Sequence, residues 1–161
     1  MEMGINIHKP FPKRPRLKDF DYRGTYSYFI TILTQDHGAI FNEVEVVNNL
    51  VDILVEIAKL ERFSILAYCF MPDHLHLLVS GADDKSNLKK FVNLLKQKSG
   101  YWFKKNYNEN VWHISYYDHV LRKEESIEGV ARYILDNPVR KGLVSDYKEY
   151  PFSWSFWTVQ S

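Results

Sequence analysis

The stretch FSILAYCFMPDHLHLLVSG, residues 63–81, decides the fold. Residues 63–70 and 74–80 are apolar and aromatic, which favours strands, and the Pro72–Asp73 pair between them favours a turn. Two neighbouring strands joined by a short turn predict a hairpin, which Gly81 closes. Residues 25–34 lie upstream and are rich in aromatic and β-branched side chains, so they predict another strand.

Segments with helical periodicity separate these strands. Asn42 offers a helix start, and apolar residues then recur at helical spacing up to residue 60. Residues 85–105 predict a second helix with lysines on its remaining positions. A further strand is expected over 111–122.

A last helix is expected over 124–136, and it should stop at Asn137–Pro138 because proline disfavours helical geometry in the residue before it. The aromatic tail, residues 150–157, should pack back on the body. The order β-α-β-β-α-β-α belongs to the α+β class: a ferredoxin-like split βαβ fold with an added C-terminal helix.

Length and composition indicate one globular domain. The chain has 161 residues, of which 45% are hydrophobic and 16% aromatic, enough for a single core. We expect an extended basic arm over residues 1–23 and a body over 24–157. No apolar run is long enough to span a membrane and the start lacks the layout of a secretory signal, so a cytoplasmic location is expected. The single cysteine, Cys69, is expected to be a buried thiol.

The formal net charge of +1 conceals two basic segments. Residues 9–18 and 85–105 together hold 12 of the 21 lysines and arginines and none of the 20 acidic residues. Prolines make the first segment an extended arm, and aromatic side chains interleave with the lysines of the second. Each segment alone fits a solvated surface, but together they favour a nucleic-acid partner. The predicted DNA-binding residues are Arg14, Arg16, Lys89, Lys90, Lys96 and Lys98.

Two histidines stand at the start of the second hairpin strand. Successive side chains of a strand point to opposite faces, so His74 and His76 share one face, with ~6–7 Å between their Cα atoms. Their ring nitrogens can converge on one divalent ion and leave positions open for a third ligand, water or a substrate oxygen. The other interpretation is a pair of histidines on a solvated sheet face. One cysteine and no zinc-ligand spacing argue against a zinc finger.

A longer set of motifs surrounds this pair. Residues 68–79, with Met-Pro-Asp-His-Leu-His at their centre, resemble the His-hydrophobic-His motif of the HUH single-tyrosine transposases of the insertion-sequence-200/605 type, above all their REP-associated relatives. Residues 112–122 and 133–144 are similar to the family's second and third blocks. Residues 16–24 resemble its opening and residues 150–155 its closing block. The blocks follow the family's order along nearly the whole chain.

The resemblance implies strand transfer on single-stranded DNA. A tyrosine hydroxyl attacks a phosphodiester, which leaves a free 3′-hydroxyl and a 5′-phosphotyrosine that a second strand end resolves. It also implies Mg²⁺ or Mn²⁺ as cofactor and single-stranded or hairpin DNA as partner, at the ends of a mobile element or at palindromic repeats. The sequence does not decide whether the protein mobilises an element or is a domesticated relative that no longer does so. It also does not decide between a monomer and a homodimer.

Tyr133 is the tyrosine onto which the family motif carries the nucleophile's role. Asn137 lies four residues on and therefore falls on the same side of the helix, so it is the predicted third metal ligand beside His74 and His76. Asn137 is also an ordinary helix stop before proline. Asp73 could orient the ring of His74, whereas His113 and His119 are assigned no role.

A second interpretation belongs to a different class of protein. The same fold supports non-catalytic single-stranded DNA or RNA binding on a sheet that bears aromatic side chains. Such a module needs no paired histidines, and the segment around His74 and His76 lacks the aromatic-glycine consensus of RNA-binding domains of this fold. The sequence therefore favours the enzyme.

Overall fold

The computed structural model describes residues 20–158. Its centre is an antiparallel sheet with the strand order β4-β1-β3-β2-β5, in which β3 lies between β1 and β2. The strands are β1 (Ser27–Leu33), β2 (Phe63–Met71), β3 (His74–Gly81), β4 (Tyr117–Val120) and β5 (Ser153–Ser155).

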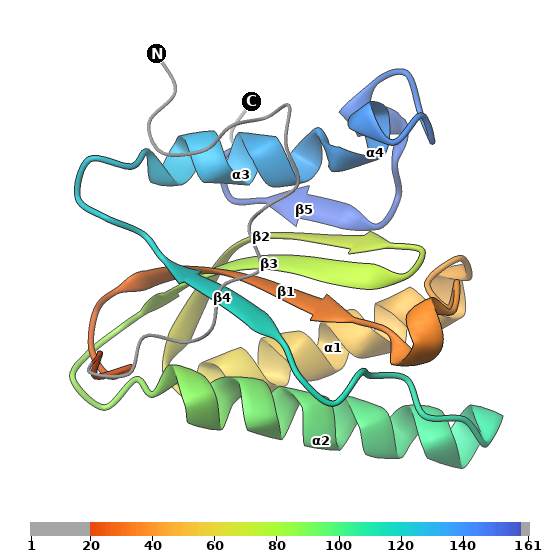
Figure 1. Ribbon diagram of the computed structural model, residues 1–161, viewed down its shortest axis with the longest axis horizontal. Helices are drawn as coiled ribbons and strands as arrows, with labels where there is room; N and C mark the ends of the chain where they lie inside the picture. Colours follow the sequence, from red (N-terminus) through yellow and green to blue (C-terminus); the bar gives the residue numbers. More distant parts are fainter. Residues whose placement is uncertain (1–19, 159–161) are drawn as a thin grey trace.

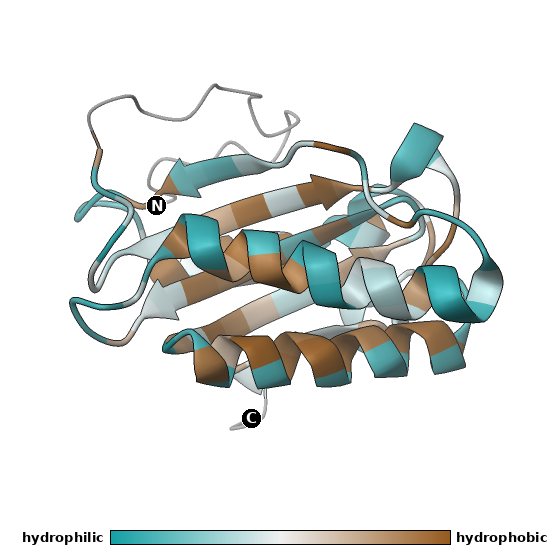
Figure 2. Ribbon diagram, turned by 90° about the horizontal axis from the view of Figure 1, so that it is seen from below, coloured by the Kyte–Doolittle hydropathy of each residue, from teal (hydrophilic) through white to brown (hydrophobic). Residues whose placement is uncertain are grey.

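Helices cover both faces of this sheet (Figure 1). On one face, α1 (Val44–Leu60) and α2 (Leu88–Tyr107) lie side by side, and Figure 2 looks directly at this pair. On the other face, α3 (Ile127–Leu135) packs over β2 and β3, and the short α4 (Asn137–Arg140) follows it. Two 3₁₀ turns complete the order, η1 (Gln35–His37) and η2 (Tyr147–Glu149).

The ferredoxin-like fold expected from the sequence is confirmed. β1, α1 and β2 form a split βαβ unit, since β3 pairs with both strands and separates them. α1 buries a helical stripe against the sheet, and so does α2. Asn87 caps the start of α2, and its side chain accepts a hydrogen bond from the Lys90 N–H. Asn108 caps the end of α2 in the left-handed conformation common at helix ends.

The alternation of side chains along β3 divides the interior into two clusters. Leu75, Leu77 and Val79 belong to the cluster beneath α1 and α2. Leu78 belongs to the cluster beneath α3, so His74 and His76 face α3 as well. The sheet therefore separates the histidines from the lysine-rich helix α2.

Two sequence-based boundaries are wrong. The strand predicted over 111–122 is regular only in β4, because Lys96 Nζ donates hydrogen bonds to the carbonyls of His113 and Ile114 at 2.8 and 3.0 Å and draws this backbone toward α2. The helix predicted over 124–136 begins only at Ile127, after the Ser126 cap. The chain also does not leave helical geometry at Asn137–Pro138 as predicted. The short helix α4 follows at once with Pro138 in its first turn, where proline is tolerated.

The remaining expectations concern the two ends of the chain. The aromatic tail packs back as expected, with Ser153–Ser155 pairing with β2 as an edge strand. Most of the predicted basic arm, including Arg14 and Arg16, lies outside the described residues. Within residues 20–158, no helix is both long and apolar enough to cross a membrane.

Candidate nucleophile and metal-binding site

The two histidine rings meet at their Nε2 atoms. The tight turn between β2 and β3 places His74 at the first position of β3, and His76 follows on the same face. The two Nε2 atoms are 3.1 Å apart. Two ligands at adjacent positions of an octahedral Mg²⁺ site, each ~2.1 Å from the ion, would stand about 3 Å apart. The spacing therefore fits the binding of one ion by both rings.

Neighbouring side chains fix the other nitrogen of each ring. Nδ1 of His74 lies 2.7 Å from Asp73 Oδ1. An ionised carboxylate can only accept a hydrogen bond, so Nδ1 carries the proton, and the neutral ring has its lone pair on Nε2. Nδ1 of His76 lies 3.0 Å from the Thr31 hydroxyl on β1. Partners of this kind orient metal-binding histidines and set their tautomer. Asp73 thus makes the contact that the sequence suggested for it.

Burial keeps both rings neutral. Burial lowers the pKa of His76 well below its usual value, and the neighbouring His74, Arg140 and Lys141 lower it further, since each disfavours a positive charge on His76. Burial also lowers the pKa of His74, while Asp73 acts in the opposite direction. Neutral imidazole is the form that binds metal ions. The electrostatics of the site therefore agree with the hydrogen-bond geometry.

Asn137 is the third polar group at this point. It is 4% exposed at the junction of α3 and α4, and its Nδ2 lies 3.4 Å from His74 Nε2. A half-turn of the amide would present its oxygen to the same place. The part of the chain that the structure describes contains no group of three or more His, Cys, Asp or Glu side chains that could hold a metal. A site here would therefore consist of two imidazoles and an amide oxygen, completed by water or substrate.

Tyr133 belongs to the same cluster of side chains. Its ring is 7% exposed and packs edge-on against Phe29, with 5.9 Å between centroids. Phe29 also packs against His76, with 5.3 Å between ring centroids. Phe29 thus joins the tyrosine on α3 to the histidine on β3.

Arg140 contacts Tyr133 in two ways. Its guanidinium carbon lies 4.0 Å from the centroid of the Tyr133 ring, and its Nη2 donates to the Tyr133 carbonyl at 2.8 Å. The same Nη2 lies 3.5 Å from Asn137 Oδ1. The cation is attracted by the face of the ring, and the backbone bond fixes the position of that cation.

The predicted lysines of α2 lie on the opposite face of the sheet from this cluster. Lys89 lies over the Tyr22 ring at 5.0 Å, and Lys90 lies 3.6 Å from Glu61. Lys96 bonds to backbone carbonyls, and Lys98 is exposed. The structure thus brings together His74, His76, Asn137 and Tyr133, but it does not add the α2 lysines to them.

Three other residues of the motifs, His119, Tyr116 and Tyr117, lie in different surroundings. His119 donates from Nε2 to the carboxylate of Glu125 at 2.9 Å, and Glu125 is 7% exposed just before α3. Tyr116 belongs to the core beneath α1 and α2. Tyr117 pairs with Thr31, so it faces the same side as His76.

Sequence reasoning missed Thr31, Phe29 and Arg140. Thr31 and Phe29 lie on a strand far from the histidines in sequence, and only the register of β1 against β3 brings them there. Arg140, in contrast, carried a usable signal, since it lies in the Asn-Pro-Val-Arg segment that follows Tyr133.

The chain is similar to a family of transposases. Residues 23–137 match the family model of IS200-like transposases. A Haemophilus influenzae protein assigned to the REP-associated tyrosine transposases is 28% identical over 147 residues, which cover 84% of this chain and 82% of the relative. The REP-associated tyrosine transposase of Escherichia coli K12 is 26% identical over 108 residues, covering 62% of this chain and 59% of the relative.

Two solved structures share the fold. A REP-associated tyrosine transposase bound to a REP hairpin has a TM-score of 0.71 at 18% identity, over 87% of this chain and 82% of that one. A Deinococcus radiodurans protein described as a transposase has a TM-score of 0.53 at 24% identity, over 68% of this chain and 88% of that one. Both likenesses support the architecture derived from the sequence.

Proposed function

The chain belongs to the IS200-like transposase family, an enzyme family that acts on DNA, and from that premise we propose that it cleaves and rejoins single-stranded DNA through Tyr133. The observation that carries this proposal is the meeting of Tyr133, Phe29 and the His74–His76 pair in one cluster beneath α3. The proposal requires that the Tyr133 oxygen and the histidine nitrogens act on one phosphodiester, and their shared contact with Phe29 supports it.

His74, His76 and Asn137 are the residues proposed to hold Mg²⁺ or Mn²⁺. The 3.1 Å spacing of the Nε2 atoms, the neutral rings and the oriented Nδ1 atoms support such a site. When bound, the ion would polarise a phosphoryl oxygen. Two nitrogens and one amide oxygen are a weak ligand set for these oxygen-preferring ions, so we expect loose, exchangeable binding.

The proposed reaction needs Tyr133 as the nucleophile. The phenol oxygen forms a bond to phosphorus and the bond from phosphorus to the 3′ oxygen breaks. The phenol proton passes to solvent, and the leaving oxygen takes up a proton to become a 3′-hydroxyl. Arg140 holds the ring from one side and favours the phenolate that forms during the attack. Phe29 holds it from the other side.

Hairpin DNA is the proposed substrate. One solved relative of the same fold is bound to a REP hairpin, and two curated relatives are REP-associated tyrosine transposases by name or assignment. We therefore propose that the chain acts next to hairpins at palindromic repeats or element ends, in the cytoplasm and on the nucleoid. Non-catalytic binding on an open sheet is less well supported, because α3 packs over β2 and β3 on the histidine face.

A covalent adduct would test this proposal directly. The protein is incubated with Mn²⁺ and a DNA hairpin that carries single-stranded flanks and a label 3′ of the expected cut. After digestion with nuclease and trypsin, mass spectrometry searches for phosphorylated tyrosine. Cleavage after Arg132 and Arg140 gives a peptide of residues 133–140, and Tyr133 is the one tyrosine in it. Nucleotide mass on this peptide would support the proposal, whereas an adduct on another peptide, or none with any hairpin, would contradict it.

A further inference from the structure

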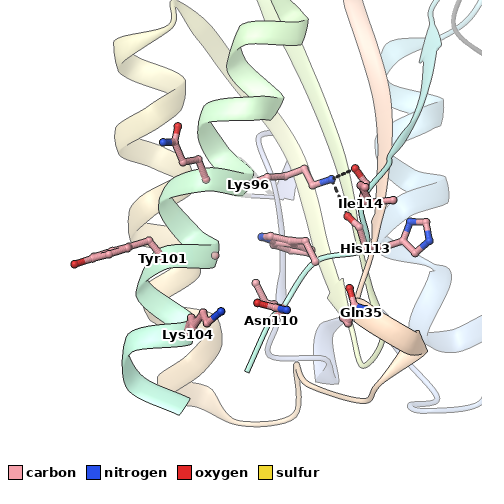
Figure 3. A pocket seen from close by; sticks show the side chains of 11 residues that line it. Gln35, Lys96, Tyr101, Lys104, Asn110, His113 and Ile114 are labelled. Carbon is pink, nitrogen blue, oxygen red and sulfur yellow. Dashed lines mark hydrogen bonds between the residues drawn. The ribbon is translucent and has the colours of Figure 1, made fainter. Parts of the chain in front are cut away.

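A pocket opens between the second half of α2 and residues 110–114 (Figure 3). Its volume is about 550 Å³, and none of the eleven residues that line it is acidic. The lining includes two lysines, Lys96 and Lys104, and three side-chain amides, those of Gln35, Gln97 and Asn110. The pocket lies on the α2 side of the sheet, apart from the histidine pair.

Trp112 provides the aromatic part of this pocket. The side chain is nearly buried, with 8% of the residue exposed, and its Nε1–H donates to Ser99 Oγ at 2.7 Å. The polar group of the indole is thus already satisfied inside the protein. What the ring offers to the pocket is carbon surface, which suits the stacking of a nucleobase.

The lysines supply positive charge next to this ring. Lys96 Nζ donates hydrogen bonds to the carbonyls of His113 and Ile114 at the wall of the pocket. Lys104 is exposed about two helical turns further along the same helix. A stacking surface beside two cations and several amides fits a nucleotide: a base, its polar edge and its phosphate.

Gly100 gives an independent indication that the pocket is kept open. It lies inside α2, where glycine costs roughly 0.5–1 kcal/mol relative to alanine. Steric crowding does not require it, because the nearest atom that an added Cβ would meet within 4 Å is Trp112 Cδ1, at an ordinary contact distance of 3.9 Å. A side chain here would instead stand against the edge of Trp112. The glycine therefore leaves uncovered the small part of the Trp112 ring that faces the pocket, at a cost to helix stability.

The pocket also lies close to the end of the sheet where the histidine site begins. Gln35 lines the pocket, and the preceding residue, Thr34, donates from its N–H and from its hydroxyl to the Asp73 carbonyl, both at 3.0 Å. Asp73 is the residue that holds His74. A single DNA strand that passes around this end of the sheet would reach both the pocket and the histidine site.

We propose that this pocket binds one unpaired nucleotide of the single-stranded DNA, with its base stacked on Trp112 and its phosphate beside Lys104. The inference rests on the proposed function, because it takes the same DNA as ligand. The DNA would then contact the protein at a second point outside the cleavage site. This contact would link the basic helix α2 to the histidine face of the sheet.

Photocrosslinking would test the inference without any cleavage. The full chain, in EDTA, is mixed with a DNA hairpin that carries five unpaired thymidines on each side, and each thymidine in turn is replaced by 5-iodo-2′-deoxyuridine. We expect irradiation to link one position, or two adjacent positions, to Trp112 in the tryptic peptide of residues 106–122. Crosslinks that avoid Trp112 at every position would overturn the proposal.

Two pairs of variants test the same point by affinity, measured as fluorescence anisotropy of the labelled hairpin. Gly100→Met should cover the ring and weaken binding at least about five-fold, the lower end of the loss of a base stack, whereas the smaller Gly100→Ala should weaken it less. Thermal unfolding of both variants verifies that they fold. Lys104→Ala should reduce the salt dependence of log K by about 0.7, whereas Lys105→Ala, which removes the same charge outside the pocket, should change it less.

The results separate the two proposals. If Gly100→Met and Lys104→Ala bind the hairpin as the wild type does, while the wild type forms the Tyr133 adduct, the pocket assignment is wrong and the cleavage function stands. If Trp112 crosslinks but no adduct forms on any hairpin, the pocket assignment stands and the cleavage function is wrong.

Discussion

Thr31 on β1 holds His76 on β3 through a contact of 3.0 Å between its hydroxyl and the ring Nδ1. The two residues are 45 positions apart in sequence but face each other in the register of the antiparallel pair. Because Nδ1 is engaged there, Nε2 points toward the Nε2 of His74. One hydroxyl on the central sheet thus orients half of the proposed metal site.

Replacing Thr31 should weaken metal binding without unfolding the protein. Thr31→Val keeps the shape and the β-branch but removes the hydroxyl, so His76 loses the partner that orients its ring. We expect the affinity for Mn²⁺, measured by titration calorimetry, to fall about 10- to 100-fold. Thr31→Ser, which keeps a hydroxyl, should stay closer to wild type. Equal affinities of Thr31→Val and wild type would show that the contact does not support a metal site.

Removing the oxygen of Tyr133 should abolish cleavage but leave folding and hairpin binding unchanged. Tyr133→Phe keeps the ring that packs between Phe29 and Arg140. The loss of one hydroxyl should cost no more than about 1–2 kcal/mol in the free energy of unfolding. We therefore expect normal hairpin binding and no adduct on a denaturing gel. An adduct that persists in this variant would transfer the nucleophile's role to another tyrosine, with Tyr117 on the same face as the first to examine.

Removing the charge of Arg140 should slow adduct formation. Arg140→Met keeps a flexible, unbranched side chain but takes the cation away from the Tyr133 ring and its carbonyl. A cation over a ring contributes ~0.5–2 kcal/mol, which corresponds to about a 2- to 30-fold slower single-turnover rate. The matched control is Arg132→Met, since Arg132 is exposed on α3 and pairs with Glu128 on the surface. Equal rates for the two variants would contradict a role of Arg140 in positioning Tyr133.

The bond between His119 and Glu125 should stabilise the start of α3. The carboxylate of Glu125 is buried and accepts hydrogen bonds from His119 Nε2 and from the Arg122 N–H. Glu125→Gln places an amide nitrogen against a donor, so we expect the free energy of unfolding in urea to fall by about 1–3 kcal/mol. Glu128→Gln makes the same exchange at an exposed surface pair and should change it by less than ~1 kcal/mol. A smaller loss for Glu125→Gln than for Glu128→Gln would show that this bond does not fasten α3.

Several elements could be predicted from sequence because their signals are local. The hairpin of β2 and β3 was predicted because turn-forming residues interrupt two apolar strands, and α1 and α2 because their apolar residues recur at helical spacing. The error over 111–122 arose from a distant contact. Residues 111–116 look like a strand in composition, but Lys96 takes the carbonyls of His113 and Ile114 that a longer ladder would use.

The sequence by itself determined which residues are the candidates for the chemistry. His74 and His76 share a face because side chains alternate along a strand, and the motif around Tyr133 singles it out among 11 tyrosines. Only the tertiary structure decided what surrounds them. The register of β1 against β3 brings Thr31 to His76, the packing of α3 on the sheet brings Tyr133 to Phe29, and the sheet itself puts the lysines of α2 on the other side. The physical reason is that periodicity acts between near neighbours in the chain, whereas register and layer order depend on contacts between residues far apart in it.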